Sequence, residues 1–118
     1  MSIGAPFKRL KLAYINAAST NIPTTYGTGA SSLILTDVGD KGYRHIKIVN
    51  ETSSRIALCL TDKDSGTPDS STSTNDSQDI VSATSTEFKD DIHLYDRVFL
   101  RSDSGSAITS GIVAVVLW

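Results

Sequence analysis

The chain has few of the straight-chain residues that favour helices, with two Glu and one Gln among 118 residues. It also has a single cysteine, so no internal disulfide can form and no cysteine cluster can bind zinc. No apolar run approaches the roughly 18 residues that a membrane-spanning helix needs. These absences argue against a helical bundle, a disulfide-stabilised scaffold, a zinc domain and a membrane-spanning protein.

Charge of either sign is also scarce. Eleven basic and 13 acidic residues give a net charge of -2, which offers no overall attraction to nucleic acid or to anionic membranes. The N-terminal sequence MSIGAPFKRLKLAY lacks the apolar run of a signal peptide. We therefore expect a protein that is not exported by a cleaved signal and binds neither nucleic acid nor membrane.

Hydroxyl residues are abundant, since 17 Ser and 13 Thr make up about a quarter of the chain. Ser, Thr and Asp compete with helix formation by bonding to their own backbone, and Thr favours strands. A chain of this length fits one domain, because domains typically hold about 100–150 residues. The composition predicts one domain of strands joined by polar turns.

Period-2 alternation and short apolar runs mark the expected strands. They fall at 10–15, 32–36, 43–50, 55–61, from 80, within 88–94, at 97–101 and at 112–118. We predict one all-β domain over 10–118, an antiparallel β-sandwich of seven to eight strands, jelly-roll-like or immunoglobulin-like, with a small barrel as the alternative. Residues 1–9 would form an N-terminal arm.

Two connections carry further predictions. The alternating strands at 43–50 and 55–61 are joined by five polar residues, which favours a hairpin. Residues 62–79 contain no large apolar side chain, and five Asp against one Lys give them a local charge of -4. We expect this segment to be a long mobile surface loop.

Candidate catalytic residues are sparse. His45 and His93, the two histidines, each fall within an expected strand, and no G-x-S-x-G motif accompanies them. Cys59 lies between two leucines and is interpreted as a small packing residue on the second face of its strand. The aspartates are mostly explained by turns. We therefore expect no enzyme activity.

Two short motifs resemble sites without completing them. Asp62 and Asp64 precede Gly66 as in oxygen-ligand calcium loops, but the spacing misses the EF-hand pattern and no bidentate Glu follows. Asn50-Glu51-Thr52 matches a glycosylation acceptor, which has no meaning in a protein that is not exported. No metal or cofactor is predicted.

The termini carry the candidate interface residues, which are Phe7, Lys8, Arg9, Leu10 and Trp118. The basic arm could reach a neighbouring subunit with Phe7 and Leu10 as anchors. The apolar strand at 112–118 must be covered on its second face either by its own sheet or by a partner. The sequence favours assembly over catalysis.

Two segments carry a resemblance to a known group. The strand and turn from Ile46 to Asp62, with Asn50-Glu51-Thr52 at the turn, resemble small virion structural proteins of tailed bacteriophages. The ending from Arg97 to Val115, a strand, a Ser/Gly turn, Thr-Ser-Gly and a final strand, is similar to the same group.

The resemblance implies a non-enzymatic virion component, of the capsid decoration (cement) type or a neck or tail accessory. Its partners would be other virion proteins, namely major capsid, neck or tail subunits, and copies of itself in a homo-oligomer. It would be located in the virion, assembled in the host cytoplasm. The alternative is a carbohydrate- or receptor-binding β-sandwich module at a tail tip.

Overall fold

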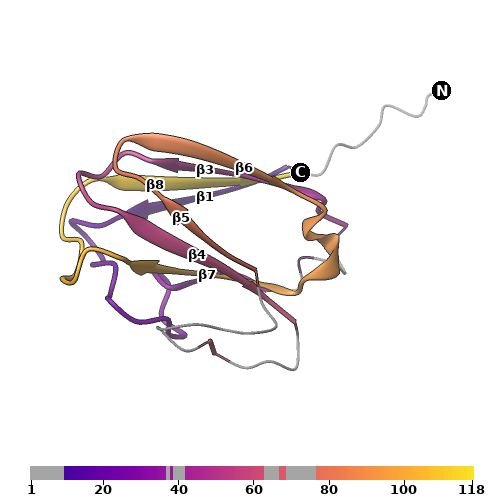
Figure 1. The fold of residues 1–118 in the computed structure, drawn as a ribbon, viewed down its shortest axis with the longest axis horizontal. Helices are drawn as coiled ribbons and strands as arrows, with labels where there is room; N and C mark the ends of the chain where they lie inside the picture. The colour runs from indigo at the N-terminus through magenta and orange to yellow at the C-terminus, as the bar shows by residue number, and fades with distance from the viewer. Residues whose placement is uncertain (1–9, 37, 39–41, 63–66, 69–76) are drawn as a thin grey trace.

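The computed structural model describes residues 10–36, 38, 42–62, 67–68 and 77–118. Within these residues, eight strands form two four-stranded antiparallel sheets that lie one over the other (Figure 1). The strands are β1 (Lys11–Asn16), β2 (Leu33–Leu35), β3 (His45–Asn50), β4 (Ile56–Thr61), β5 (Ser77–Val81), β6 (Ser85–Asp90), β7 (Arg97–Ser102) and β8 (Ile112–Leu117). A 3-10 turn, η1 (Ile92–Leu94), precedes β7.

The strand order identifies the topology. The first sheet has the order β1-β8-β3-β6 and the second has the order β2-β7-β4-β5. The strands therefore pair from the two ends of the chain toward its middle: β1 with β8, β2 with β7, β3 with β6 and β4 with β5. This is the connectivity of a jelly roll, in which one long folded ribbon rolls into two sheets. The predicted β-sandwich is confirmed, and the described strands form no closed barrel.

The predicted hairpin at 43–61 is wrong. β3 and β4 lie in different sheets, and the polar residues between them carry the chain from one sheet to the other. Asn50 fixes this crossing, because its Nδ2 donates to the backbone oxygens of Ser54 (2.8 Å) and Ser82 (3.1 Å). Its Oδ1 accepts from the backbone N and the Oγ1 of Thr52. A buried, fully bonded amide holds the corner where a hairpin turn was expected.

Two boundaries also differ from the sequence prediction. Ile92–Leu94 forms the 3-10 turn η1 where a short strand was expected, so His93 lies in a turn. Asp91 starts this turn with a left-handed φ of 59°. β5 begins at Ser77, inside the predicted loop at 62–79, and Pro68 is buried. Residues 63–66 and 69–76 of that loop lie outside the described residues, as does the arm at 1–9.

The main core lies between the two sheets and follows the period-2 rule. β3 buries Ile46 and Ile48 on its inner side, while His45, Lys47 and Val49 alternate with them. The inner faces of β4, β7 and β8 supply the rest, including Ile56, Leu58, Leu60, Val98, Leu100, Val113, Val115 and Leu117. Each such side chain stabilises the fold by about 1.5–3 kcal/mol.

The outer face of the second sheet has a cover of its own. Tyr26, in the segment before β2, packs with Phe99, Ala57 and Cys59 in a second apolar cluster. The segment is pinned to β7, because Ser32 Oγ donates to the Leu100 oxygen at 2.8 Å and Ser32 O accepts from the Leu100 nitrogen. Every residue of β4 is consequently buried.

Candidate interaction surface

The outer face of the first sheet is the most apolar exposed surface that the register brings together. Residues directly opposite one another in antiparallel strands point to the same side. One row runs from Leu12 through Val116 and Lys47 to Phe88. The next row runs from Tyr14 through Ala114 and Val49 to Thr86. We call this surface, with Ile112 and Trp118 at the ends of β8, the open face.

The exposed fractions show that nothing described covers the open face. Tyr14 is 68% exposed, Phe88 65% and Leu12 46%, while Ile112 and Trp118 are each 37% exposed. In the middle, Ala114 is only 9% exposed, because the larger flanking side chains shield it. Large apolar side chains gathered on one flat surface mark a contact site more often than scattered ones do.

The polar groups on the open face lie toward β3 and β6. The Lys47 ammonium lies 5.6 Å from the centre of the Phe88 ring. His45 Nδ1 is 2.7 Å from Asp90 Oδ1, and the His45 ring stacks on Trp118 with centroids 5.3 Å apart. The half of the face on β1 and β8 has no charged side chain directed outward among the described residues. The face is therefore apolar at one side and mixed at the other.

The size of the open face limits what it can do alone. Four strands of six residues cover about 400 Å² at ordinary strand spacing. A standard stable interface buries about 800 Å² on each partner. Contacts made by this face alone are thus individually weak, and many copies must add them together.

The predicted interface residues divide between described and undescribed regions. Leu10 is 69% exposed at the start of β1, and Trp118 follows β8 on the open face. Phe7, Lys8 and Arg9 lie outside the described residues. The sequence reasoning missed Leu12, Tyr14 and Phe88, although the apolar residues on both sides of β1 were a signal that neither of its faces is polar.

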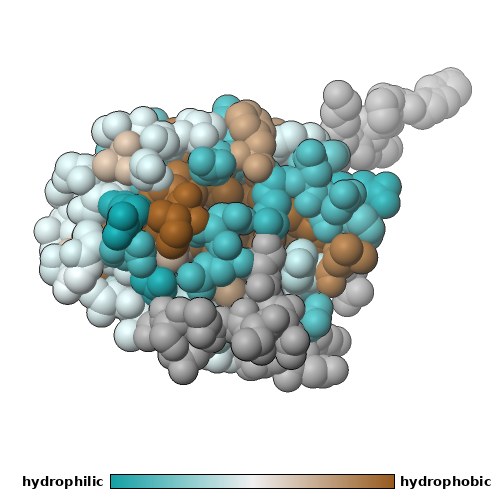
Figure 2. Space-filling model, viewed as in Figure 1, coloured by the Kyte–Doolittle hydropathy of each residue, from teal (hydrophilic) through white to brown (hydrophobic). Residues whose placement is uncertain are grey.

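The edge of the sandwich at β5 and β6 contrasts with the open face. Figure 2 shows a hydrophobic patch over β5 framed by polar residues. Ile80 on β5 is 43% exposed, and Lys89 bridges to Asp79 at 2.9 Å between β6 and β5. Charged residues thus interrupt the apolar surface along this edge.

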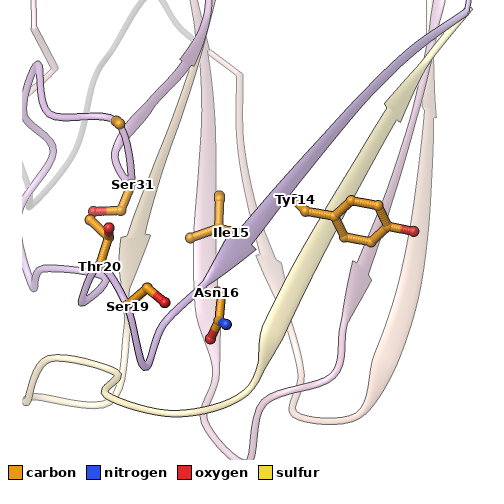
Figure 3. Close-up of a pocket in the computed structure, with 7 residues that line it drawn as sticks. Tyr14, Ile15, Asn16, Ser19, Thr20 and Ser31 are labelled. Atoms are coloured by element: carbon orange, nitrogen blue, oxygen red, sulfur yellow. The ribbon is translucent and has the colours of Figure 1, made fainter.

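The described pocket has no catalytic set. It encloses about 250 Å³ and is lined by Tyr14, Ile15, Asn16, Ser19, Thr20, Ala30 and Ser31. Figure 3 shows Ile15 directed toward Ser31, while the Tyr14 ring points away from the hydroxyl residues. Ligand pockets typically hold about 300–1,000 Å³ and converge several polar groups on the ligand. This hollow is better described as the groove beside the outer edge of β1.

Among the described residues, neither histidine is hydrogen-bonded to a side chain that could act as a nucleophile, and Cys59 packs in an apolar cluster. The described polar partner of His45 is Asp90, and no hydroxyl or thiol is among the described hydrogen-bond partners of either histidine. Cys59 is buried under Tyr26 and Phe99, which places it on the second face of its strand as predicted. Burial raises the pKa of the Tyr26 hydroxyl well above its usual range, with a smaller contribution from Cys59.

The two short motifs gain no support as sites. Among the described residues, no group of three His, Cys, Asp or Glu side chains could hold a metal ion, and most of the Asp62–Gly66 motif lies outside them. Asn50 is 1% exposed, and both its Nδ2 and its Oδ1 form hydrogen bonds within the connection between β3 and β4. It is a structural residue and is not accessible to a glycosyl carrier.

Fold and surface together define a class. In the part of the chain that the structure describes, it is an eight-stranded jelly-roll domain in which one sheet is covered by the segment around Tyr26 and the other sheet has no described cover. Comparison with protein-family models, curated proteins and solved structures finds no match to the chain. No helix in the described part of the chain is long and apolar enough to span a membrane.

Proposed function

We propose that the protein is a non-enzymatic structural component of a bacteriophage virion, a capsid decoration protein or a head-tail or tail accessory protein. The open face carries this proposal, because it offers an apolar surface that none of the described residues covers. Its partners are other virion proteins, major capsid, neck or tail subunits, and copies of itself. Jelly rolls are frequent in viral capsids, which supports the assignment at the level of the fold alone.

Interface burial is the mechanism. Seating Tyr14, Leu12 and Phe88 against a neighbouring subunit removes their apolar surface from water, at about 25 cal/mol per Å² before the costs of association. One such contact is weak, but repetition over a symmetric particle adds the contacts together. The protein then clamps neighbouring subunits without any single strong site.

The test is to locate the chain in assembled particles. Mass spectrometry of purified virions should detect it in a fixed number of copies, and purified protein should rebind particles from which it has been removed. Absence from the particle, together with no binding to any virion subunit, would overturn the proposal.

A matched pair of variants connects binding to the open face. Tyr14→Ser combined with Phe88→Ser should weaken particle binding by about tenfold or more, since two largely exposed rings are lost. Ile80→Ser removes a partly exposed hydrophobic side chain from β5 in the other sheet and should bind as the wild type does. Equal loss in both variants would contradict the role of the open face.

A second candidate function is a carbohydrate- or receptor-binding module at a tail tip. The observation in its favour is that Tyr14, Phe88 and Trp118 expose rings on one flat face, as platforms for sugars do. A glycan array with the wild type and with Tyr14→Ser tests it. Binding to a defined glycan that Tyr14→Ser abolishes would favour this function, and no binding to any glycan would remove it.

A further inference from the structure

The four outer strands of the two sheets differ in how they are protected against pairing with another chain. Native proteins protect edge strands by shortness, bulges or charge. β2 has three residues, and its register with β7 shifts between Leu33 and Leu35. β6 carries Glu87, Lys89 and Asp90, and on β5 Asp79 pairs with Lys89.

β1 lacks these protections. Its six residues pair with β8 in one unbroken register from Lys11 to Asn16, without proline and with a single charge. No described strand pairs with its other side. Next to Tyr14, Ile15 and Asn16 that side opens into the groove whose far wall is formed by Ser19, Thr20, Ala30 and Ser31, and no wall residue of this groove lies beside Lys11, Leu12 or Ala13. β1 is therefore the edge at which a further strand can be added.

The hydrogen-bond pattern shows which backbone groups point out of this edge. Ala17 N donates to Gly111 O at 2.9 Å and continues the register of β1 with β8. Bonded pairs alternate along an antiparallel ladder, so Lys11, Ala13 and Ile15 direct their backbone groups to β8. The amides and carbonyls of Leu12 and Tyr14 then point outward.

We propose that β1 pairs with β1 of a second copy about a two-fold axis, joining two first sheets into one eight-stranded sheet. The β1 pairing rests on the proposed function and specifies how one of its partners, a second copy of the chain, is bound. The outward backbone groups that can pair belong to Leu10, Leu12 and Tyr14, because Asn16 O already accepts from Ser19 N and Thr20 N. Only even-numbered residues can therefore form the bonded pairs. Because these residues also point to the open face, the two open faces become one continuous surface.

A register with its axis at Ala13 pairs the outward backbone groups of Leu12 and Tyr14 with those of the second copy's Tyr14 and Leu12. Leu12 then lies opposite the second copy's Tyr14, a pairing of apolar and aromatic side chains that stabilises sheets. The two Lys11 side chains lie four positions apart along the ladder, about 13 Å, which exceeds the screening length of about 8 Å. The strand is thus complementary to itself in hydrogen bonding, side-chain packing and charge.

Sedimentation equilibrium of the full chain tests the pairing. The wild type should form a dimer, and Leu12→Lys should weaken it by about tenfold or more, since each dimer then carries the new charge twice at the junction. Phe88→Lys, on the same face but at the β6 edge, should leave the dimer constant within about twofold. A wild type that stays monomeric, or equal dissociation in both variants, would overturn the proposal.

Cysteine crosslinking tests the register. In a Cys59→Ala background, Ala13→Cys places two thiols opposite each other at the axis, where Cα atoms of a non-bonded pair are about 4.5 Å apart. Leu12→Cys leaves them about 8 Å apart, beyond disulfide reach. Ala13→Cys should therefore form a disulfide dimer under mild oxidation, and crosslinking at Leu12 in its place would overturn the register.

The outcomes separate this inference from the proposed function. A monomer that still binds particles would overturn β1 pairing and leave the virion role intact. A dimer that disappears in Leu12→Lys but never binds a virion subunit would support the pairing and overturn the virion role.

Discussion

The two sheets of this sandwich differ in what lies on their outer faces. On the second sheet, Tyr26 and its neighbours fold over Phe99 and bury β4 completely. On the first sheet, Tyr14 and Phe88 remain about two-thirds exposed. Both outer faces carry large apolar side chains, so composition alone does not determine burial. The difference is that the segment around Tyr26 covers one outer face, whereas no described residue covers the other.

The largest expected effect compares two phenylalanines. Phe99→Ala should destabilise the fold by about 3–5 kcal/mol, because it opens a cavity under Tyr26. Phe88→Ala should cost less than about 1 kcal/mol, since its ring is 65% exposed. Urea unfolding of both variants measures the difference. Similar losses for the two would mean that the open face is covered in solution.

The next effect concerns the corner that joins the two sheets. Asn50→Ala should cost about 2–4 kcal/mol, because several buried groups lose their partners at about 1–3 kcal/mol each. Asn50→Asp keeps the acceptor for Thr52 but turns an oxygen toward two carbonyl oxygens, so it should also destabilise. Thermal unfolding checks both variants. A neutral result for either would show that the crossing holds without this amide.

Alkaline pH should affect the covered face. Burial raises the pKa of Tyr26 in the folded state above its ordinary value of 10.0, so the folded protein keeps a proton that the unfolded chain releases. The stabilisation is complete below about pH 10 and is lost as the pH rises above it, at up to about 1.4 kcal/mol per pH unit.

The control for this pH effect is Tyr26→Phe, which retains the ring over Phe99 and removes the hydroxyl. Urea unfolding between pH 9 and 11 should show a shallower loss of stability in the variant than in the wild type. Identical slopes would mean that Tyr26 reaches solvent and that the cover is loose.

The sequence predicted the strands better than their pairing. Alternation at Ile46 and Ile48 located β3 and its inner face, since burial on one side of a strand leaves a period of two. The hairpin prediction failed because five polar residues suit a turn or a crossing equally well. The bonds of Asn50 to Ser54 and Ser82 decide between them, and a contact 32 residues distant leaves no local pattern.

The candidate surface was predictable only in part. Leu10 and Trp118 were expected at an interface and are exposed, whereas Leu12 and Tyr14 were not singled out. β1 is apolar on both sides, so its alternation did not tell which side faces the core. That choice depends on pairing with β8, whose paired residues are 96 or more positions away in the chain.

The smallest expected effect concerns Lys47 and Phe88 at the β6 side of the open face. An ammonium 5.6 Å from a ring centre contributes about 0.5–1 kcal/mol when water surrounds it and about 2 kcal/mol or more when water is excluded. A double-mutant cycle with Lys47→Met and Phe88→Leu should therefore give a coupling energy below about 1 kcal/mol for the isolated protein. Repeating the cycle on particle binding should give a larger value if this side of the face is buried against another subunit. A large coupling energy already present in dilute monomer would contradict an open face, because only a cover supplied by the chain itself could exclude water there.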